Sequence, residues 1–177
     1  LEKILPLVKK YGGAVLGLTL DKDGIPEKAD KRFEIAKKIM NTALSYGIPK
    51  QDIYIDCLTL TASAEQESVL ETLDALERVK KELGLKTVLG VSNISFGLPN
   101  RELINRTFLS MALMKGLDLP IINPNVESMT GAVRAYRLLA NHDKNSAEFI
   151  EIYGNTAPAP KQAEKTSGHT LDYAIEK

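Results

Sequence analysis

Tryptophan is absent from the 177-residue sequence, and cysteine occurs once, as Cys57. A single cysteine excludes an internal disulfide framework and is typical of a reducing compartment, so we expect a cytoplasmic protein. Net charge is also lacking, because 23 Lys and Arg residues balance 23 Asp and Glu residues. We therefore expect no nucleic acid and no anionic membrane surface as a partner. No run of about 18 apolar residues is present, so we also expect no membrane-spanning helix.

The sequence also lacks the short motifs that bind nucleotides or metals. It contains no Gly-x-Gly-x-x-Gly and no P-loop pattern. His142 and His169 have no neighbours at ligand spacing. We therefore expect no metal site in this chain.

What the sequence does contain is an alternation of short apolar runs with longer segments of helical periodicity. Apolar runs that begin near residues 14, 53, 87 and 119 predict strands. Helices are predicted over 1–12, 30–47, 63–84, 101–115 and 126–139. Strands that are apolar on both faces and alternate with helices are typical of an α/β fold with a parallel sheet. Four such units make a small open sheet or half of a (β/α)₈ barrel, which typically needs about 250 residues.

The composition changes after Gly154. Residues 154–169 are polar and contain two prolines, which predicts a linker rather than a packed segment. Residues 170–177 again place apolar side chains at helical spacing. We therefore expect one domain over 1–153, a linker over 154–169, and the start of a further helix or domain over 170–177. Because the chain begins with Leu inside a helical pattern, we also expect it to belong to a longer polypeptide.

Polar side chains stand where each predicted strand ends. They are Asp21, Asp56, Ser92 with Asn93, and Asn123. In parallel α/β folds a ligand binds outside the carboxyl ends of the strands, so these side chains predict a binding site. At any one position the alternative is a helix cap or an Asx turn. Carboxylate and carboxamide groups together suit a planar heterocycle with an amide-like edge.

Cys57 follows Asp56 directly, so its side chain should point to the opposite face of the strand. We interpret it as a buried, unreactive thiol rather than a nucleophile.

Three segments that contain these strand ends resemble a known family. "GLTLDKDGIPEKADKR" (17–32), "IYIDCLTLTAS" (53–63) and "LGVSNISFGLPNRELINRTFLSMALMKGLDLPIINP" (89–124) are similar to the fifth to eighth units of the pterin-binding methyltransferases. That family includes the folate domain of cobalamin-dependent methionine synthase and the methyltetrahydrofolate:corrinoid/iron–sulfur protein methyltransferases. The resemblance implies a (β/α)₈ TIM-barrel fold, of which residues 1–153 cover roughly strands 5–8. The barrel's N-terminal half would have to come from the same polypeptide or from another chain.

The resemblance also implies roles for individual residues. Asn93 matches the asparagine near N5 of the pterin, where the methyl group leaves, and is the candidate catalytic residue. Asp56 matches an aspartate that binds the pterin ring. The remaining candidates for substrate binding are Gly90 and Ser92, which line the pocket; Arg101, which approaches the folate; Phe96, which fits the methionine synthase branch; and Asn123, which has no assigned role.

The function implied is binding of 5-methyltetrahydrofolate and transfer of its N5-methyl group to cob(I)alamin, held by a separate cobalamin-binding module, in methionine synthesis. A corrinoid/iron–sulfur protein methyltransferase is the alternative, and so is a non-catalytic half barrel that needs its missing half to bind folate. Dihydropteroate synthase, a more distant relative, would need a Lys-x-Arg-like strand end, and none is present.

Overall fold

A computed structural model describes residues 2–155, and it contains all four predicted strands. They form one parallel sheet in the order β1-β2-β3-β4. The strands are β1 (Val15–Leu18), β2 (Ile53–Asp56), β3 (Lys86–Gly90) and β4 (Leu119–Ile121). The α/β class predicted from the alternating pattern is therefore confirmed.

Helices precede the first strand, connect the strands and follow the last one. They are α1 (Leu5–Tyr11), α2 (Ala29–Ser45), α3 (Glu67–Arg78), α4 (Arg101–Met114), α5 (Glu127–Leu139) and α6 (Ala147–Tyr153). Short helical turns flank them: η1 (Lys50–Asp52), η2 (Val79–Leu83), η3 (Val91–Ser95) and η4 (Lys144–Ser146). Within this described range no helix is long and apolar enough to cross a membrane.

Two predicted boundaries were wrong, and one helix was missed. Helix α3 begins at Glu67 rather than at residue 63 or 64, because the preceding hydroxyls make loop contacts instead of capping the helix. Val91, predicted as the end of a strand, opens the 3-10 turn η3. Helix α6 was not predicted. The linker expected over 154–169 lies almost wholly outside the described residues, and the segment 170–177 lies entirely outside them.

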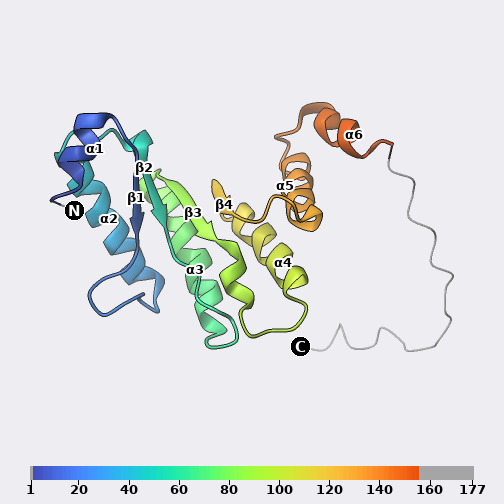
Figure 1. Cartoon of the computed structure of the whole chain (residues 1–177), viewed down its shortest axis with the longest axis horizontal. Coiled ribbons are helices and arrows are strands. Elements are labelled where there is room, and N and C mark those ends of the chain that lie inside the picture. Colours follow the sequence, from blue (N-terminus) through green and yellow to red (C-terminus); the bar gives the residue numbers. More distant parts are fainter. Residues whose placement is uncertain (1, 156–177) are drawn as a thin grey trace.

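The core lies between the sheet and the helices that cover one of its faces. Figure 1 shows α2, α3 and α4 side by side behind the strands, with α5 and α6 continuing beyond α4. Alternate strand residues such as Ile53, Ile55 and Leu89 point into this layer and are fully buried. Each such side chain contributes roughly 1.5–3 kcal/mol by leaving water.

Helix α2 follows its sequence pattern closely. Its buried stripe includes Phe33, Ala36 and Ile39, at the spacing that places them on one helix face. The helix lies so close to β1 that a Cβ added to Gly17 would be 2.7 Å from Cγ2 of Ile39. Gly17 is therefore a packing requirement, because any side chain there would push α2 away from the sheet.

The opposite face of the sheet is open and apolar. Leu16 and Leu18 of β1 are 53% and 41% exposed, and Leu119 and Ile121 of β4 are 47% and 58% exposed. Parallel sheets are normally covered on both faces, so this open face is unusual for an isolated layer. The strand register aligns Leu18 with Asp56 and Asp56 with Val88, which places Asp56 on the open face.

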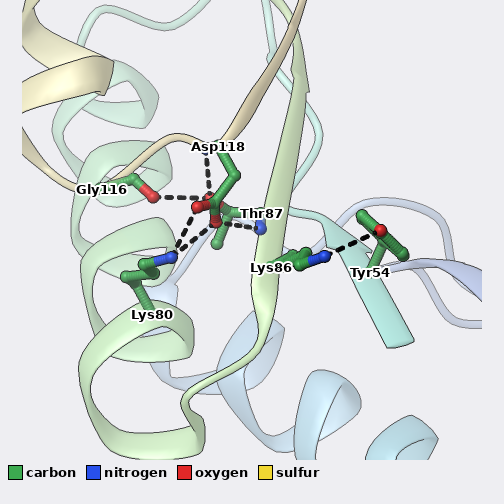
Figure 2. A network of polar contacts seen from close by, with 6 residues as sticks. All are labelled: Tyr54, Lys80, Lys86, Thr87, Gly116 and Asp118. Atoms are coloured by element: carbon green, nitrogen blue, oxygen red, sulfur yellow. Dashed lines mark hydrogen bonds and ion pairs between the residues drawn. The ribbon is translucent and has the colours of Figure 1, made fainter. Parts of the chain in front are cut away.

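A polar network fixes β4 beside β3 at the end of the sheet where these strands begin (Figure 2). The Asp118 carboxylate accepts hydrogen bonds from Lys80 Nζ at 2.6 and 2.8 Å and from the Thr87 backbone N–H at 2.9 Å. The Thr87 hydroxyl donates to the Gly116 carbonyl at 2.8 Å. At the opposite end of the sheet, loops follow the carboxyl ends of β1, β2 and β3, as the lower edge of Figure 1 shows.

Candidate functional site

Asp56 ends β2 on the open face of the sheet, and its side chain is held by its own backbone. The residue is 7% exposed, and its Oδ1 accepts a hydrogen bond from the Leu58 N–H at 2.8 Å. Burial raises the pKa of the Asp56 carboxyl, and the Leu58 hydrogen bond partly opposes that shift. Leu58 adopts a left-handed backbone conformation with φ 60°, which is uncommon for a residue other than glycine. The turn after β2 therefore holds the carboxylate in a defined place.

Asn93 lies in η3, immediately after the neighbouring strand β3, and is exposed. Its carboxamide folds back over the strand end, because a Cβ added to Gly90 would lie 3.2 Å from Asn93 Nδ2. Gly90 occupies the same face of the sheet as Asp56, two residues beyond the register partner Val88. Strand spacing and rise put the Cα atoms of Asp56 and Gly90 about 8 Å apart. The structure thus brings the three predicted site residues together.

Arg101 and Phe96 contact the turn that carries Asn93. The Arg101 guanidinium donates to Ser95 Oγ at 3.0 Å and to the Ser92 carbonyl at 3.1 Å. It also lies over the Phe96 ring, 4.5 Å from its centroid. Arg101 therefore stabilises η3 through hydrogen bonds to the Ser95 side chain and the Ser92 backbone. A contact of Arg101, Phe96 or Ser92 with folate stays a prediction.

Asn123 is engaged locally. Its Oδ1 accepts a hydrogen bond from the Asn125 N–H at 3.0 Å, and the residue is exposed. This is the Asx turn that the sequence pattern left open for any single strand end. Asn123 follows β4, at the far edge of the sheet from β1. Its place in a binding site remains a prediction.

Two hydroxyls that the sequence reasoning missed join the loops after β2 and β3. Thr61 Oγ1 and Ser63 Oγ donate to the Phe96 carbonyl at 2.9 and 2.7 Å, and the Ala62 N–H donates to the Ile94 carbonyl at 2.9 Å. These bonds fix the loop that carries Asn93 to the loop that follows Asp56. The hydroxyl-rich stretch Thr59 to Ser63 was the only sequence signal for this contact.

Cys57 lies next to Asp56 but on the opposite face of the sheet. Cys57 is fully buried among the helix-facing side chains, as predicted from its position next to Asp56. Burial raises the pKa of its thiol to about 12, so it is not a thiolate nucleophile near neutral pH. Among residues 2–155, no group of three or more His, Cys, Asp or Glu side chains is arranged to hold a metal ion.

The polar groups at this face can form hydrogen bonds to a ligand. Ionised Asp56 accepts hydrogen bonds, and Asn93 both donates and accepts them. The apolar strand side chains beside them provide a surface on which a ring can lie. This combination of a few placed polar groups on an apolar wall is typical of small-molecule sites.

Comparison with known proteins shows the family of this chain. The family model described as "Pterin binding enzyme" matches residues 2–123. Methionine synthases of Mycobacterium leprae and Mycobacterium tuberculosis are 40% and 37% identical over 129 residues, 68% of this chain and 11% of each relative. A methylcorrinoid:tetrahydrofolate methyltransferase of Eubacterium limosum is 28% identical over 150 residues, 84% of this chain and 55% of the relative. The chain thus spans about a tenth to a half of these relatives, and it belongs to the pterin-binding enzyme family.

Proposed function

We propose that this chain supplies strands 5–8 of a (β/α)₈ barrel. The supporting observation is the open sheet face with its exposed residues Leu16, Leu18, Leu119 and Ile121. Within residues 2–155, β1 pairs only with β2 and β4 only with β3, so both outer strands present an unpaired edge. Four further strand–helix units would pair both edges and cover the apolar face.

The proposed function of the completed barrel is to bind 5-methyltetrahydrofolate and pass its N5-methyl group to cob(I)alamin. The observation that carries this proposal is the placement of the Asp56 carboxylate and the Asn93 carboxamide on one face, at the ends of neighbouring strands. Asp56 would accept hydrogen bonds from the N–H groups of the pterin ring. Asn93 would lie at N5, on the edge of the ring that carries the methyl group.

The task of this site is to make N5 a better leaving group. When the N5–CH₃ bond breaks, the bonding electron pair stays on N5, which must be protonated because a bare amide anion is a poor leaving group. Asn93 cannot supply that proton, which would come from solvent, but its carboxamide oxygen can accept a hydrogen bond from protonated N5 and hold the ring in line with the acceptor. That hydrogen bond exists only once N5 is protonated, so it stabilises the reacting form more than it strengthens binding of the unprotonated substrate.

The methyl acceptor would come from a separate module. Bound cob(I)alamin supplies a low-valent cobalt nucleophile. The loops after β1, β2 and β3 lie together at one end of the sheet, which leaves the methyl-bearing edge of the pterin accessible from that side (Figure 1). A cobalamin-binding module is therefore the proposed partner.

A second candidate is exchange of methyl groups with a corrinoid protein outside methionine synthesis. It is favoured by the Eubacterium limosum relative, whose match extends over 84% of this chain, compared with 68% for the methionine synthases. Both candidates use the same pterin contacts. They differ only in the protein that holds the corrinoid and in the direction of net transfer.

The test is a methyl-transfer assay on the 177-residue chain, alone and with a polypeptide that supplies the other barrel half. Formation of methylcobalamin from free cob(I)alamin and 5-methyltetrahydrofolate is followed by absorbance. We expect transfer only when both halves are present, and a large loss in Asp56→Asn and Asn93→Ala. Full activity of both variants would refute the assignment, and folate binding without transfer would indicate a binding module. Comparing corrinoid proteins as acceptors then separates the two candidates.

A further inference from the structure

Arg32 of α2 is one of the largest fully buried side chains in the described range, with 0% exposure. Its Nε donates to the Pro26 carbonyl at 2.6 Å. Its Nη1 donates to the carbonyls of Cys57 and Leu58 at 3.2 and 3.1 Å and to Thr72 Oγ1 at 2.7 Å. One guanidinium thus links the loop after β1, the turn after β2 and helix α3.

Arg32 has no direct ion-pair partner in the described range, although the charges of Glu71 and Glu65 favour its ionised form. Among residues 2–155 no carboxylate forms an ion pair with it, and its Nη2 is buried without a hydrogen-bond partner. Burial accordingly lowers the pKa of the guanidinium. Burying a cation without a counter-ion costs free energy, so this arrangement is a poor way to stabilise a fold. It is a good way to fix carbonyl groups, because a planar guanidinium presents its donors in rigid directions.

The carbonyls that Arg32 binds belong to the turn that orients Asp56. The Leu58 carbonyl accepts from Arg32, while the Leu58 N–H donates to Asp56 Oδ1 at 2.8 Å. Leu58 has φ 60°, so the turn is held in a conformation that a leucine seldom adopts unaided. The Leu58 carbonyl is therefore hydrogen-bonded to the Arg32 guanidinium, and the Leu58 N–H is hydrogen-bonded to the Asp56 carboxylate.

We propose that Arg32 is a positioning residue, which holds the turn over residues 56–58 so that the Asp56 carboxylate faces the pterin. This inference rests on the proposed function, in which Asp56 binds the pterin ring. Arg32 makes no contact with the substrate itself, because it lies on the helix-covered side of the sheet. Nothing in the sequence pattern or the family resemblance assigned a role to this residue.

Thr72 gives a second way to disturb the same contact. Its hydroxyl accepts from Arg32 and donates to the Ser68 carbonyl at 2.8 Å within α3. Thr72→Val removes the acceptor and keeps the side-chain volume, whereas Thr72→Ser keeps the hydroxyl. The pair therefore separates the hydrogen bond from the packing, and it remains informative if Arg32→Lys fails to fold.

The first measurement needs no ligand. Amide hydrogen exchange and the ¹H–¹⁵N NMR signal of Leu58 are recorded on the full chain and on Arg32→Lys, Thr72→Val and Thr72→Ser. We expect Leu58 exchange to accelerate about tenfold or more in Arg32→Lys and Thr72→Val, as a lost charge-assisted hydrogen bond implies. We expect less than a twofold change in Thr72→Ser. Unchanged Leu58 exchange in both disruptive variants, with the fold retained, would overturn the proposal.

The second measurement asks whether Arg32 acts through Asp56. Binding of 5-methyltetrahydrofolate is titrated by NMR in Thr72→Val and Arg32→Lys, each with and without Asp56→Asn. We expect about a tenfold weaker affinity in the single variants and no further loss on the Asp56→Asn background. Additive losses would show that Arg32 acts elsewhere and would refute its positioning role. If Asp56→Asn alone leaves binding intact, the pterin assignment fails, while the Leu58 result still reports on the coupling between Arg32 and the turn.

Discussion

Gly90→Ala should separate stability from function. The backbone at Gly90 has φ −76° and ψ 92°, which an alanine can adopt without left-handed strain. Removing a glycine at such a position restricts the unfolded chain and stabilises proteins by about 0.4–1 kcal/mol. The added methyl group would lie 3.2 Å from Asn93 Nδ2, closer than an ordinary van der Waals contact. The flexible tip of Asn93 can move by a few tenths of an ångström, so little of that stabilisation should be lost.

The functional consequence runs in the opposite direction. The Asn93 carboxamide must shift from its position over the strand end, and a hydrogen bond to the pterin of about 0.5–1.5 kcal/mol would be weakened or lost. That corresponds to a loss of roughly threefold to tenfold in the step that depends on Asn93. The variant should therefore be at least as stable as the parent and a poorer methyltransferase.

Two assays on the same samples check this. Urea unfolding gives the free energy of unfolding, and methyl transfer in the completed barrel gives the activity. Gly13→Ala is the matched control, because its Cβ would meet only Val8 Cγ1 at an ordinary 3.7 Å, before β1 begins. Equal activity of Gly90→Ala and Gly13→Ala would refute the placement of Asn93 at N5. If Gly90→Ala lost more than about 1 kcal/mol of stability, the Asn93 side chain would not have moved to make room for the added methyl group, which would refute the expected shift.

The remaining predictions concern the two proposed site side chains and one surface carboxylate. Asn93→Ala should lower the rate of methyl transfer by more than it weakens folate binding, and equal losses in both would contradict its proposed role. Asp56→Asn should raise the free energy of unfolding at neutral pH. The reason is that burial raises the Asp56 pKa above 3.8, so stability is lost as pH rises through the raised folded-state pKa. Urea titrations at pH 3 and pH 7 check this, and a greater gain in the free energy of unfolding at pH 3 than at pH 7 would contradict it. Hydrogen bonds from Lys115 and Lys81 lower the pKa of Glu77 to about 2. The stability that Glu77 contributes is therefore present above pH 4.5 and should disappear between pH 4.5 and 2, an effect that Glu77→Gln and 1 M salt should both reduce if acid unfolding is followed by circular dichroism.

The alternating pattern was sufficient for the layout of the sheet. Buried parallel strands must be apolar on their helix-covered face, so runs such as Ile53 to Ile55 stand out between polar and glycine-rich segments. The strand period of two also predicted that Asp56 and Cys57 face opposite ways, which is confirmed by the full burial of the thiol in the core. The start of α3 was less predictable, because Thr61 and Ser63 use hydroxyls that could equally have capped a helix.

The sequence by itself determined the order of strands and helices and the polar residues at the strand ends, because these depend on local apolar periodicity and on neighbours along the chain. Only the tertiary structure decided how those residues are held. Arg32 reaches carbonyls 25 and 26 residues away, and Thr61 and Ser63 reach a carbonyl 35 and 33 residues away. Such bonds join side chains to backbone groups that every residue possesses, so no residue type at the far end marks the partner. The proposed site residues Asp56 and Asn93 can therefore be recognised from the local sequence, whereas their orientation is set by contacts that exist only once the loops are folded together.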